Sequence, residues 1–156
     1  MRGPLVAVVG GSSCTPQEAE WAVAVGRRLA ERGAVLVCGG LGGVMAAAAR
    51  GAKQAGGLTI GILPGSDPDD ANADIDVALA TGMGEMRNAL IVRAARAVIA
   101  IGGGWGTLSE IALARRIETP VIGLHDAFMP ALDIPRVERP DEAVEWALEQ
   151  ARAREV

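Results

Sequence analysis

The sequence predicts an α/β fold of three layers, in which a mostly parallel β-sheet lies between two layers of helices. Short runs of Val, Ile, Leu and Ala without polar positions, typical of strands buried on both faces, alternate with segments of helical periodicity. Four of these apolar runs lead into glycine, at 10–11, 39–43, 64–65 (Pro-Gly) and 102–106. Alternating strands and helices form parallel βαβ units, so helices are expected on both faces of the sheet.

The first expected strand is 4–9 (PLVAVV), which ends at two glycines. The pattern Thr15-Pro16-Gln17-Glu18 is a capping box with proline at the first helical position, so a helix is expected from there to Gly33. Further strands are expected at 34–38, 58–63, 75–79, 97–101 and 120–124, and further helices at 44–55, 85–95, from Thr107 to about 117, and 141–154. The polar stretch 66–74 predicts a loop, and 128–139 is expected to be irregular.

The composition indicates one domain, spanning 1–156, with an aliphatic core. Half of the residues are hydrophobic, but the chain has one Phe, no Tyr and three Trp. The net charge of −4 argues against a nucleic-acid partner, because binding to phosphate backbones needs a basic face. Two cysteines, Cys14 and Cys38, form no disulfide framework and indicate reduced thiols in the cytoplasm. The apolar runs are too short for a membrane span.

The two strongest motifs are CGGLGG (38–43) and GGGWGT (102–107), each between a predicted strand and the start of a helix. Glycine lets the backbone approach a ligand closely, and a helix amino terminus offers unpaired N–H groups that favour phosphate. Neither motif matches the dinucleotide fingerprint or the P-loop. The glycines could instead serve only tight turns. Two such loops at the carboxyl ends of parallel strands, however, favour a Rossmann-like site for a phosphate-bearing, nucleotide-like ligand.

The glycine-rich segment 37–65 resembles the first half of the Lonely Guy family, which is also called the lysine decarboxylase family. The strings TGMGEMRN (81–88) and IAIGGGWGTLSEIALA (99–114) are more similar to a sister branch, the molybdenum cofactor carrier proteins and related bacterial proteins. The resemblance covers about residues 4–124. It does not imply lysine decarboxylation.

In Lonely Guy enzymes an Arg and a Glu serve hydrolysis of the N-glycosidic bond of nucleoside 5′-monophosphates, and the matching residues are Arg87 and Glu110. This chain has Asn88 where that family has Lys, and Gly102 where it has Pro. The lost positive charge argues against hydrolysis more than against binding. The resemblance therefore implies a carrier or binding protein for a nucleotide or a molybdopterin-type cofactor, with no other cofactor required. Phosphoribohydrolase and nucleotide-sensing domain are the alternatives.

The expected ligand-binding residues lie in the glycine loops and beside the Arg motif. They are Gly10, Gly11, Gly39, Gly40, Gly42, Gly43, Arg87, Asn88, Gly102, Gly103, Gly104, Trp105, Gly106 and Thr107. Arg87 and Glu110 would be catalytic only in a hydrolase. No ligand spacing indicates a metal site.

Three of these side chains also have a structural interpretation. Glu110 could complete a Thr-x-x-Glu capping box with Thr107. Arg87 could be a solvated surface residue, and Trp105 could stack on a base or pterin or cover a subunit contact. Because the predicted helices 44–55 and 85–95 have little polar surface, and because the family resembled forms dimers, a homodimer or larger homo-oligomer is expected.

Overall fold

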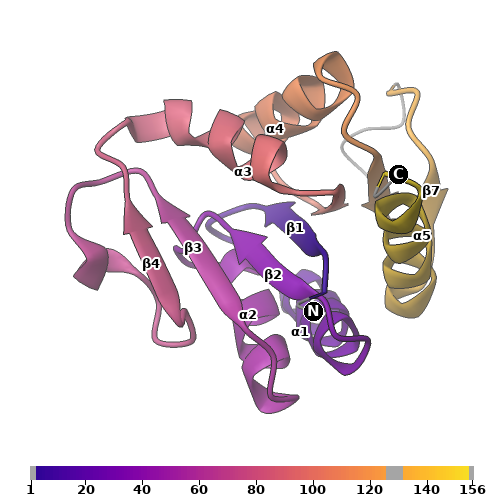
Figure 1. Cartoon of the computed structure of the whole chain (residues 1–156), viewed down its shortest axis with the longest axis horizontal. Helices are drawn as coiled ribbons and strands as arrows, with labels where there is room; N and C mark the ends of the chain where they lie inside the picture. The colour runs from indigo at the N-terminus through magenta and orange to yellow at the C-terminus, as the bar shows by residue number, and fades with distance from the viewer. Residues whose placement is uncertain (1–2, 126–131, 155–156) are drawn as a thin grey trace.

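The computed structural model describes residues 3–125 and 132–154, whose strands form one seven-stranded sheet in the order β4-β3-β2-β1-β5-β6-β7 (Figure 1). All six pairs of neighbouring strands are parallel, so the predicted α/β fold is confirmed. The strands are β1 (Leu5–Gly10), β2 (Val35–Cys38), β3 (Thr59–Leu63), β4 (Val77–Ala80), β5 (Ala97–Ile101), β6 (Val121–Leu124) and β7 (Arg136–Val137). The α-helices are α1 (Pro16–Glu31), α2 (Val44–Gln54), α3 (Asn88–Ala94), α4 (Trp105–Arg116) and α5 (Pro140–Ala153), and the short 3-10 helices are η1 (Pro68–Asp70) and η2 (Gly84–Arg87).

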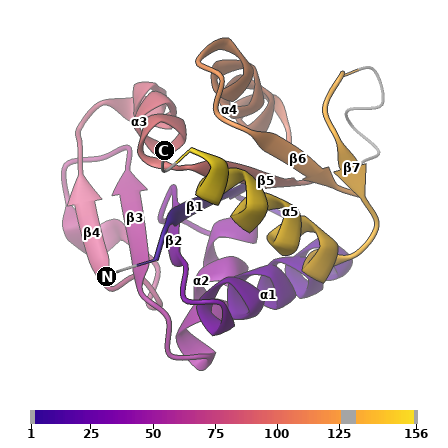
Figure 2. The same cartoon turned by 45° about the vertical axis from the view of Figure 1, so that its right-hand side comes forward.

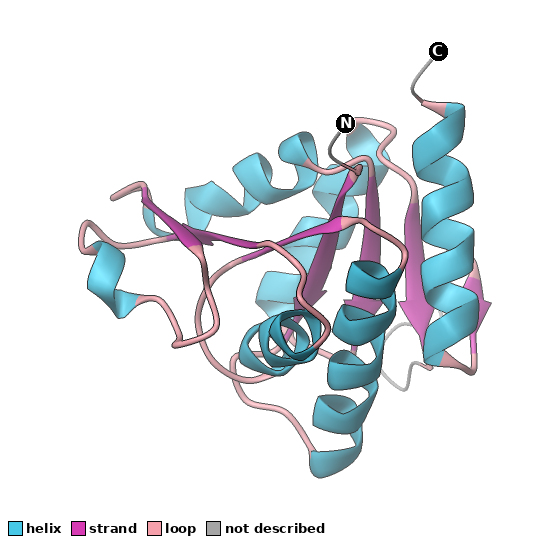
Figure 3. Cartoon of the chain, turned by 60° about the horizontal axis from the view of Figure 1, so that its bottom comes forward, coloured by secondary structure: helices cyan, strands magenta, loops and turns pink. Residues whose placement is uncertain are grey.

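Helices cover both faces of the sheet and divide the core into two clusters. On one face α1, α2 and α5 pack together, and α3 and α4 pack on the other (Figures 2 and 3). Successive residues of β1 alternate between the clusters: Val6 and Val8 contact the first, and Ala7 and Val9 the second. This alternation is why the strand sequence is apolar throughout.

Two glycines allow α1 and α2 to pack with their backbones in contact. A Cβ atom at Gly26 would lie 1.9 Å from the carbonyl oxygen of Ala48, and one at Gly51 would lie 2.0 Å from that of Val23. Alanines fill most of the remaining contact, and seven of the eleven residues of α2 are buried. The apolar character of α2 is therefore satisfied largely within the chain, between α1 and the sheet.

Most boundaries of helices and strands predicted from local sequence patterns agree with the structure to within two residues. The capping box at the start of α1 is present: the Thr15 hydroxyl accepts from the Glu18 N–H, and the Glu18 carboxylate accepts from the Thr15 N–H. The predicted helix 85–95 instead begins as η2 and becomes α-helical only at Asn88. Part of the irregular stretch 128–139 lies outside the described residues, and its remainder contains β7. No helix in the described part of the chain is long and apolar enough to cross a membrane.

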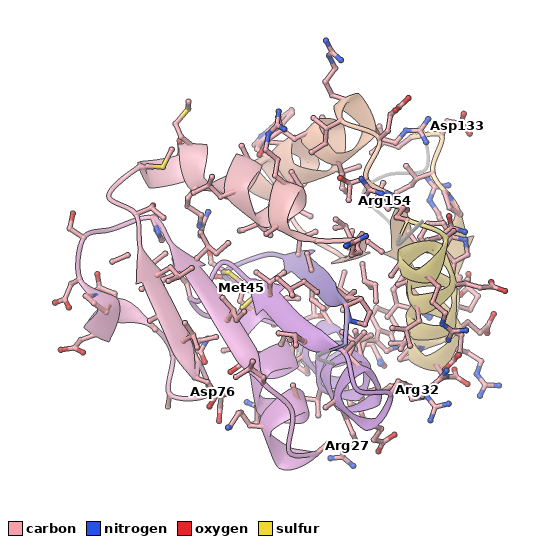
Figure 4. The ribbon with its side chains drawn as sticks, in the orientation of Figure 1. Arg27, Arg32, Met45, Asp76, Asp133 and Arg154 are labelled. Atoms are coloured by element: carbon pink, nitrogen blue, oxygen red, sulfur yellow. The ribbon has the colours of Figure 1, made fainter. Side chains whose placement is uncertain are left out.

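Polar contacts, rather than burial, hold the edge strand β4. Three of its four residues are exposed. Next to the strand, the Asp76 carboxylate accepts hydrogen bonds from Lys53 Nζ at 2.6 Å and from the backbone N–H of Thr59 at 3.0 Å. The Thr59 hydroxyl, which is buried, donates to the backbone oxygen of Asp74 at 2.5 Å. In Figure 4 Asp76 lies at the amino end of β4, away from η2.

Asp76→Ala is expected to lower the free energy of unfolding by about 1–3 kcal/mol, because it leaves the amide of Thr59 and the ammonium of Lys53 without their carboxylate partner. Hydrogen exchange at the β4 amides should accelerate more than exchange in β1. Asp69→Ala, which removes the same charge from an exposed position, is the control and should leave both measurements unchanged. Equal exchange rates in β4 of the Asp76 variant and the wild type would contradict this account.

Candidate functional site

A cavity of about 600 Å³ lies at the carboxyl ends of β1, β2 and β5. The chain runs from β1 through β2 and β3 to β4 on one side, and β5 then pairs with the other side of β1. Ligands of open parallel sheets bind at such a reversal of strand order. The cavity lining consists of Val8, Val9, Gly10, Gly11, Ser12, Gly39, Leu41, Met45, Pro64, Gly84, Glu85, Arg87, Asn88, Gly104, Gly106, Thr107 and Glu110.

The structure brings together nine of the fifteen residues singled out from the sequence. The nine are Gly10, Gly11, Gly39, Arg87, Asn88, Gly104, Gly106, Thr107 and Glu110, and the six that do not line the cavity are Gly40, Gly42, Gly43, Gly102, Gly103 and Trp105. Sequence reasoning missed Ser12 and Leu41, although both stand beside the predicted glycines. It also missed Met45 in the first turn of α2, and the segment that contributes Gly84 and Glu85.

Two of the glycines outside the lining shape the loops that carry it. Gly43 has a φ of +61°, and a Cβ atom there would lie 2.1 Å from the carbonyl oxygen of Gly11. That oxygen accepts from the N–H of Val44 at 3.0 Å, which joins the start of α2 to the end of β1. Gly103 has a φ of +109°, and a Cβ atom there would lie 2.2 Å from the Thr107 hydroxyl oxygen. Both positions need glycine for backbone reasons.

The helices α2 and α4 begin beside the cavity without side-chain caps. Their N-cap residues are Gly43 and Gly104, and neither helix has an acidic residue in its first turn. In contrast, α1 has a capping box, and α5 has two acidic residues in its first turn. The first N–H groups of a helix have no partner within the helix and carry partial positive charge. Apart from the N–H of Val44, which donates to Gly11, the partial positive charge at the start of both helices is met by no side-chain cap and no acidic residue of the first turn.

Arg87 is a buried cation held by neutral groups. It is 9% exposed, and its Nε–H donates to the carbonyl oxygen of Ile62 at 2.9 Å. Its two terminal nitrogens donate to the side-chain oxygen of Asn88 and to the carbonyl oxygen of Gly39, the latter at 3.5 Å. Among the described residues no carboxylate lies within 4 Å of the guanidinium, and two of its five N–H donors remain for a ligand. The interpretation of Arg87 as a solvated surface residue is therefore wrong.

Glycine at position 39 makes room for this arginine. A Cβ atom at Gly39 would lie 2.7 Å from Arg87 Nη2 and 2.7 Å from Met45 Sδ. Any larger residue would displace the guanidinium or the methionine, both of which line the cavity. Gly39 thus has a packing role in addition to its place at the end of β2.

Glu110 is the second buried charged group in the lining. Burial raises the pKa of its carboxyl to about 7, against a smaller opposing effect from the positive charge of Arg87. It is 8% exposed, and no hydrogen bond from the described residues reaches it. The carboxyl can therefore change its charge near neutral pH while facing the cavity.

The capping-box interpretation of Glu110 is wrong. Helix α4 begins at Trp105, with Gly104 as N-cap, so Thr107 and Glu110 both lie inside the helix. The left-handed backbone of Gly102 and Gly103 turns the chain into the helix before Thr107 is reached.

Cys38, the last residue of β2, is a packing residue beside the cavity lining. It is fully buried, and burial raises the pKa of its thiol to about 11, so it stays protonated at neutral pH. Among the described residues no group of three or more His, Cys, Asp or Glu side chains is arranged to hold a metal ion.

A Rossmann-like sheet with its cavity at the strand-order reversal, two helix starts without side-chain caps and a buried arginine is the architecture of the Lonely Guy-like class of proteins. The chain belongs to the SLOG cluster4 family, whose model matches residues 4–151.

Three relatives show where the chain lies within that class. The molybdenum cofactor binding protein of the phototrophic bacterium Rippkaea orientalis is 37% identical, with a TM-score of 0.84 over 94% of this chain and 96% of that one. The molybdenum cofactor carrier protein of Chlamydomonas reinhardtii is 31% identical, with a TM-score of 0.87 over 97% and 99%. An uncharacterized protein of Archaeoglobus fulgidus is 42% identical over 144 residues, 92% of this chain and 93% of the other. The resemblance read from the motifs is confirmed.

Glu110 should make stability depend on pH in the direction opposite to that of an ion-paired acid. Between the ordinary pKa of 4.5 and about 7 the folded protein binds more protons at Glu110 than the unfolded chain does. Stability is therefore lost as the pH rises through this window, by about 3 kcal/mol at most. Glu110→Gln should remove this loss, so urea unfolding should show a larger gain over wild type at pH 8 than at pH 5.

The exposed Glu149→Gln is the control for the change in charge, and it should give the same difference from wild type at both pH values. A Glu110→Gln variant whose difference from wild type is also equal at pH 5 and pH 8 would show that Glu110 titrates as an ordinary surface acid.

Proposed function

We propose that this protein binds a phosphate-bearing, nucleotide-like cofactor of the molybdopterin type and acts as its carrier. The observation on which this rests is the Arg87 guanidinium, which is buried at the wall of the cavity with only neutral protein partners. A buried charge without a counter-ion is costly. A phosphate group in the cavity would supply the missing negative charge and accept from the two remaining N–H donors.

The start of α4 provides the second half of the proposed phosphate site. Gly104, Gly106 and Thr107 line the same cavity as Arg87. Their backbone N–H groups belong to an uncapped helix start, which favours an anion. The cavity volume of about 600 Å³ is in the range of small-molecule sites. Leu41, Met45 and Pro64 add apolar surface to the same lining, which suits a flat heterocycle.

The relatives support a carrier rather than an enzyme, since two of them are named for binding or carrying the molybdenum cofactor. One observation favours hydrolysis of nucleoside 5′-monophosphates as the second candidate. Glu110 faces the cavity beside Arg87, and a carboxylate there could stabilise a ribosyl cation. Against hydrolysis, Asn88 is neutral and is hydrogen-bonded to both Arg87 and Ser109.

We also propose that the protein is cytoplasmic and forms a homo-oligomer. The two free cysteines suit the reducing environment of the cytoplasm. Large apolar side chains are exposed along β4, η2 and α3, namely Val77, Leu79, Met83, Met86 and Leu90. We expect a second copy of the chain to cover them in a homodimer or larger homo-oligomer.

The phosphate site can be tested at Gly104, where a Cβ atom would meet nothing within 4 Å and φ is −121°. Gly104→Val should keep the fold but narrow the cavity at the helix start, so affinity for phosphate-bearing ligands such as AMP should fall by about tenfold or more. Isothermal titration calorimetry measures the affinity, and circular dichroism the fold. Ala112→Val, on the exposed side of the same helix, should bind like wild type. Gly103 is unsuitable for this test, because its backbone cannot accept a side chain without strain.

Carrier and hydrolase differ in turnover. We expect the wild type to bind a phosphorylated ligand but to release little or no free base from AMP, GMP, CMP or UMP, as followed by chromatography. Arg87→Ala should weaken binding by about 10- to 150-fold, since a charge-assisted contact to phosphate is lost. Rapid release of base by the wild type, abolished in Glu110→Gln, would establish the hydrolase instead.

Assembly can be measured directly by light scattering, which should give at least a dimer at micromolar concentration. Leu79→Asp should shift the population towards monomer, because it places a charge among the exposed apolar side chains. Asp69→Ala serves again as a variant whose assembly should match that of the wild type. A wild-type chain that stays monomeric would contradict the expected oligomer.

A further inference from the structure

Asn88 connects the two parts of the proposed phosphate site. Its side-chain oxygen accepts from Arg87 Nη1, and its side-chain nitrogen donates to the Ser109 hydroxyl at 3.2 Å. The Ser109 hydroxyl in turn donates to the carbonyl oxygen of Gly106, at 2.6 Å, in the first turn of α4. A chain of three hydrogen bonds therefore runs from the guanidinium to the helix start that faces the same cavity.

The amide of Asn88 satisfies both ends of this arrangement. Arg87 requires an acceptor, and Ser109, whose only hydroxyl proton is given to Gly106, requires a donor. An aspartate would be nearly the same size but would supply acceptors at both ends. It would also place a full negative charge against the guanidinium in a site where Asn88 is 5% exposed.

We infer that Asn88 is a positioning residue that fixes Arg87 against the first turn of α4 while, being uncharged, it leaves the positive charge of Arg87 to the phosphate of the ligand. The residue thereby selects for anionic ligands through the position and the unneutralised charge of Arg87. This inference rests on the proposed binding of a phosphate-bearing ligand. The other charged groups of the lining, Glu85 and Glu110, are acids, so Arg87 is the only cation in the described lining.

The test compares Asn88→Asp with Asn88→Ala and uses inorganic phosphate as the probe, with affinities measured by calorimetry at low and high ionic strength. In Asn88→Asp the new carboxylate neutralises Arg87, so phosphate should bind about ten- to a hundredfold more weakly, with a shallower dependence on salt. In Asn88→Ala, Arg87 loses its hydrogen bond to the Asn88 side chain but keeps its full positive charge. Phosphate binding should therefore weaken by a smaller factor than in Asn88→Asp, with the same salt dependence as in the wild type.

A purely structural role for Asn88 predicts a different pattern: both variants would lose the same affinity at every ionic strength. That outcome would overturn the inference, as would phosphate binding by Asn88→Asp that matches wild type. Arg87→Ala separates this inference from the function itself. If Arg87→Ala binds phosphate as tightly as wild type, the proposed phosphate site is wrong; if it loses binding while Asn88→Asp does not, only the role of Asn88 is wrong.

If Asn88→Asp does not fold, Ser109→Ala provides a second test of the positioning role of Asn88. This variant removes the far partner of Asn88 without adding charge. We expect phosphate affinity about two- to tenfold below wild type and an unchanged salt dependence. Affinity equal to that of wild type would overturn the positioning role.

Discussion

The parallel pairing of β1 with β2 on one side and with β5 on the other is the constraint on which the site depends. The register pairs Val6–Gly10 residue by residue with Ala97–Ile101, so both strands end at the same level. The loops that follow them must therefore emerge together, and helices α2 and α4 start beside them on opposite faces of the sheet. Backbone hydrogen bonds between buried aliphatic strands thus place around one cavity the starts of α2, at Val44, and of α4, at Trp105, which lie far apart in the sequence.

Packing in the rest of the molecule offsets the free-energy cost of the two buried charged groups at the cavity. Arg87 and Glu110 are both buried, yet they are not paired within 4 Å, so their mutual attraction offsets only part of the desolvation cost that each bears. The aliphatic clusters on both faces and the close packing of α1 on α2 supply the compensating stability. Strain and unpaired charge concentrated at one place in an otherwise well-packed fold are typical of a functional site.

Sequence patterns predicted the fold well because the signals involved are local. Apolar runs marked six of the seven strands, and the capping box at Thr15 gave the start of α1. The short β7 was missed since two residues carry no period. The site was harder to predict, because burial is a tertiary property: nothing near Arg87 or Glu110 in the sequence shows that both are buried. Met45 was overlooked for a similar reason, since its helical neighbours made it look like an ordinary core residue.

The distribution of the aromatic residues has a consequence for spectroscopy. The chain lacks tyrosine, so its ultraviolet emission comes almost entirely from three indoles. Trp21 is stacked on His125, with ring centroids 4.1 Å apart, and Trp146 is partly buried against the core. Trp105, in contrast, is 82% exposed at the first residue of α4, next to Gly104 and Gly106 of the cavity lining. The red-shifted part of the intrinsic fluorescence therefore originates beside the site. The emission of Trp105 reports on changes in the surroundings of the cavity without an added label.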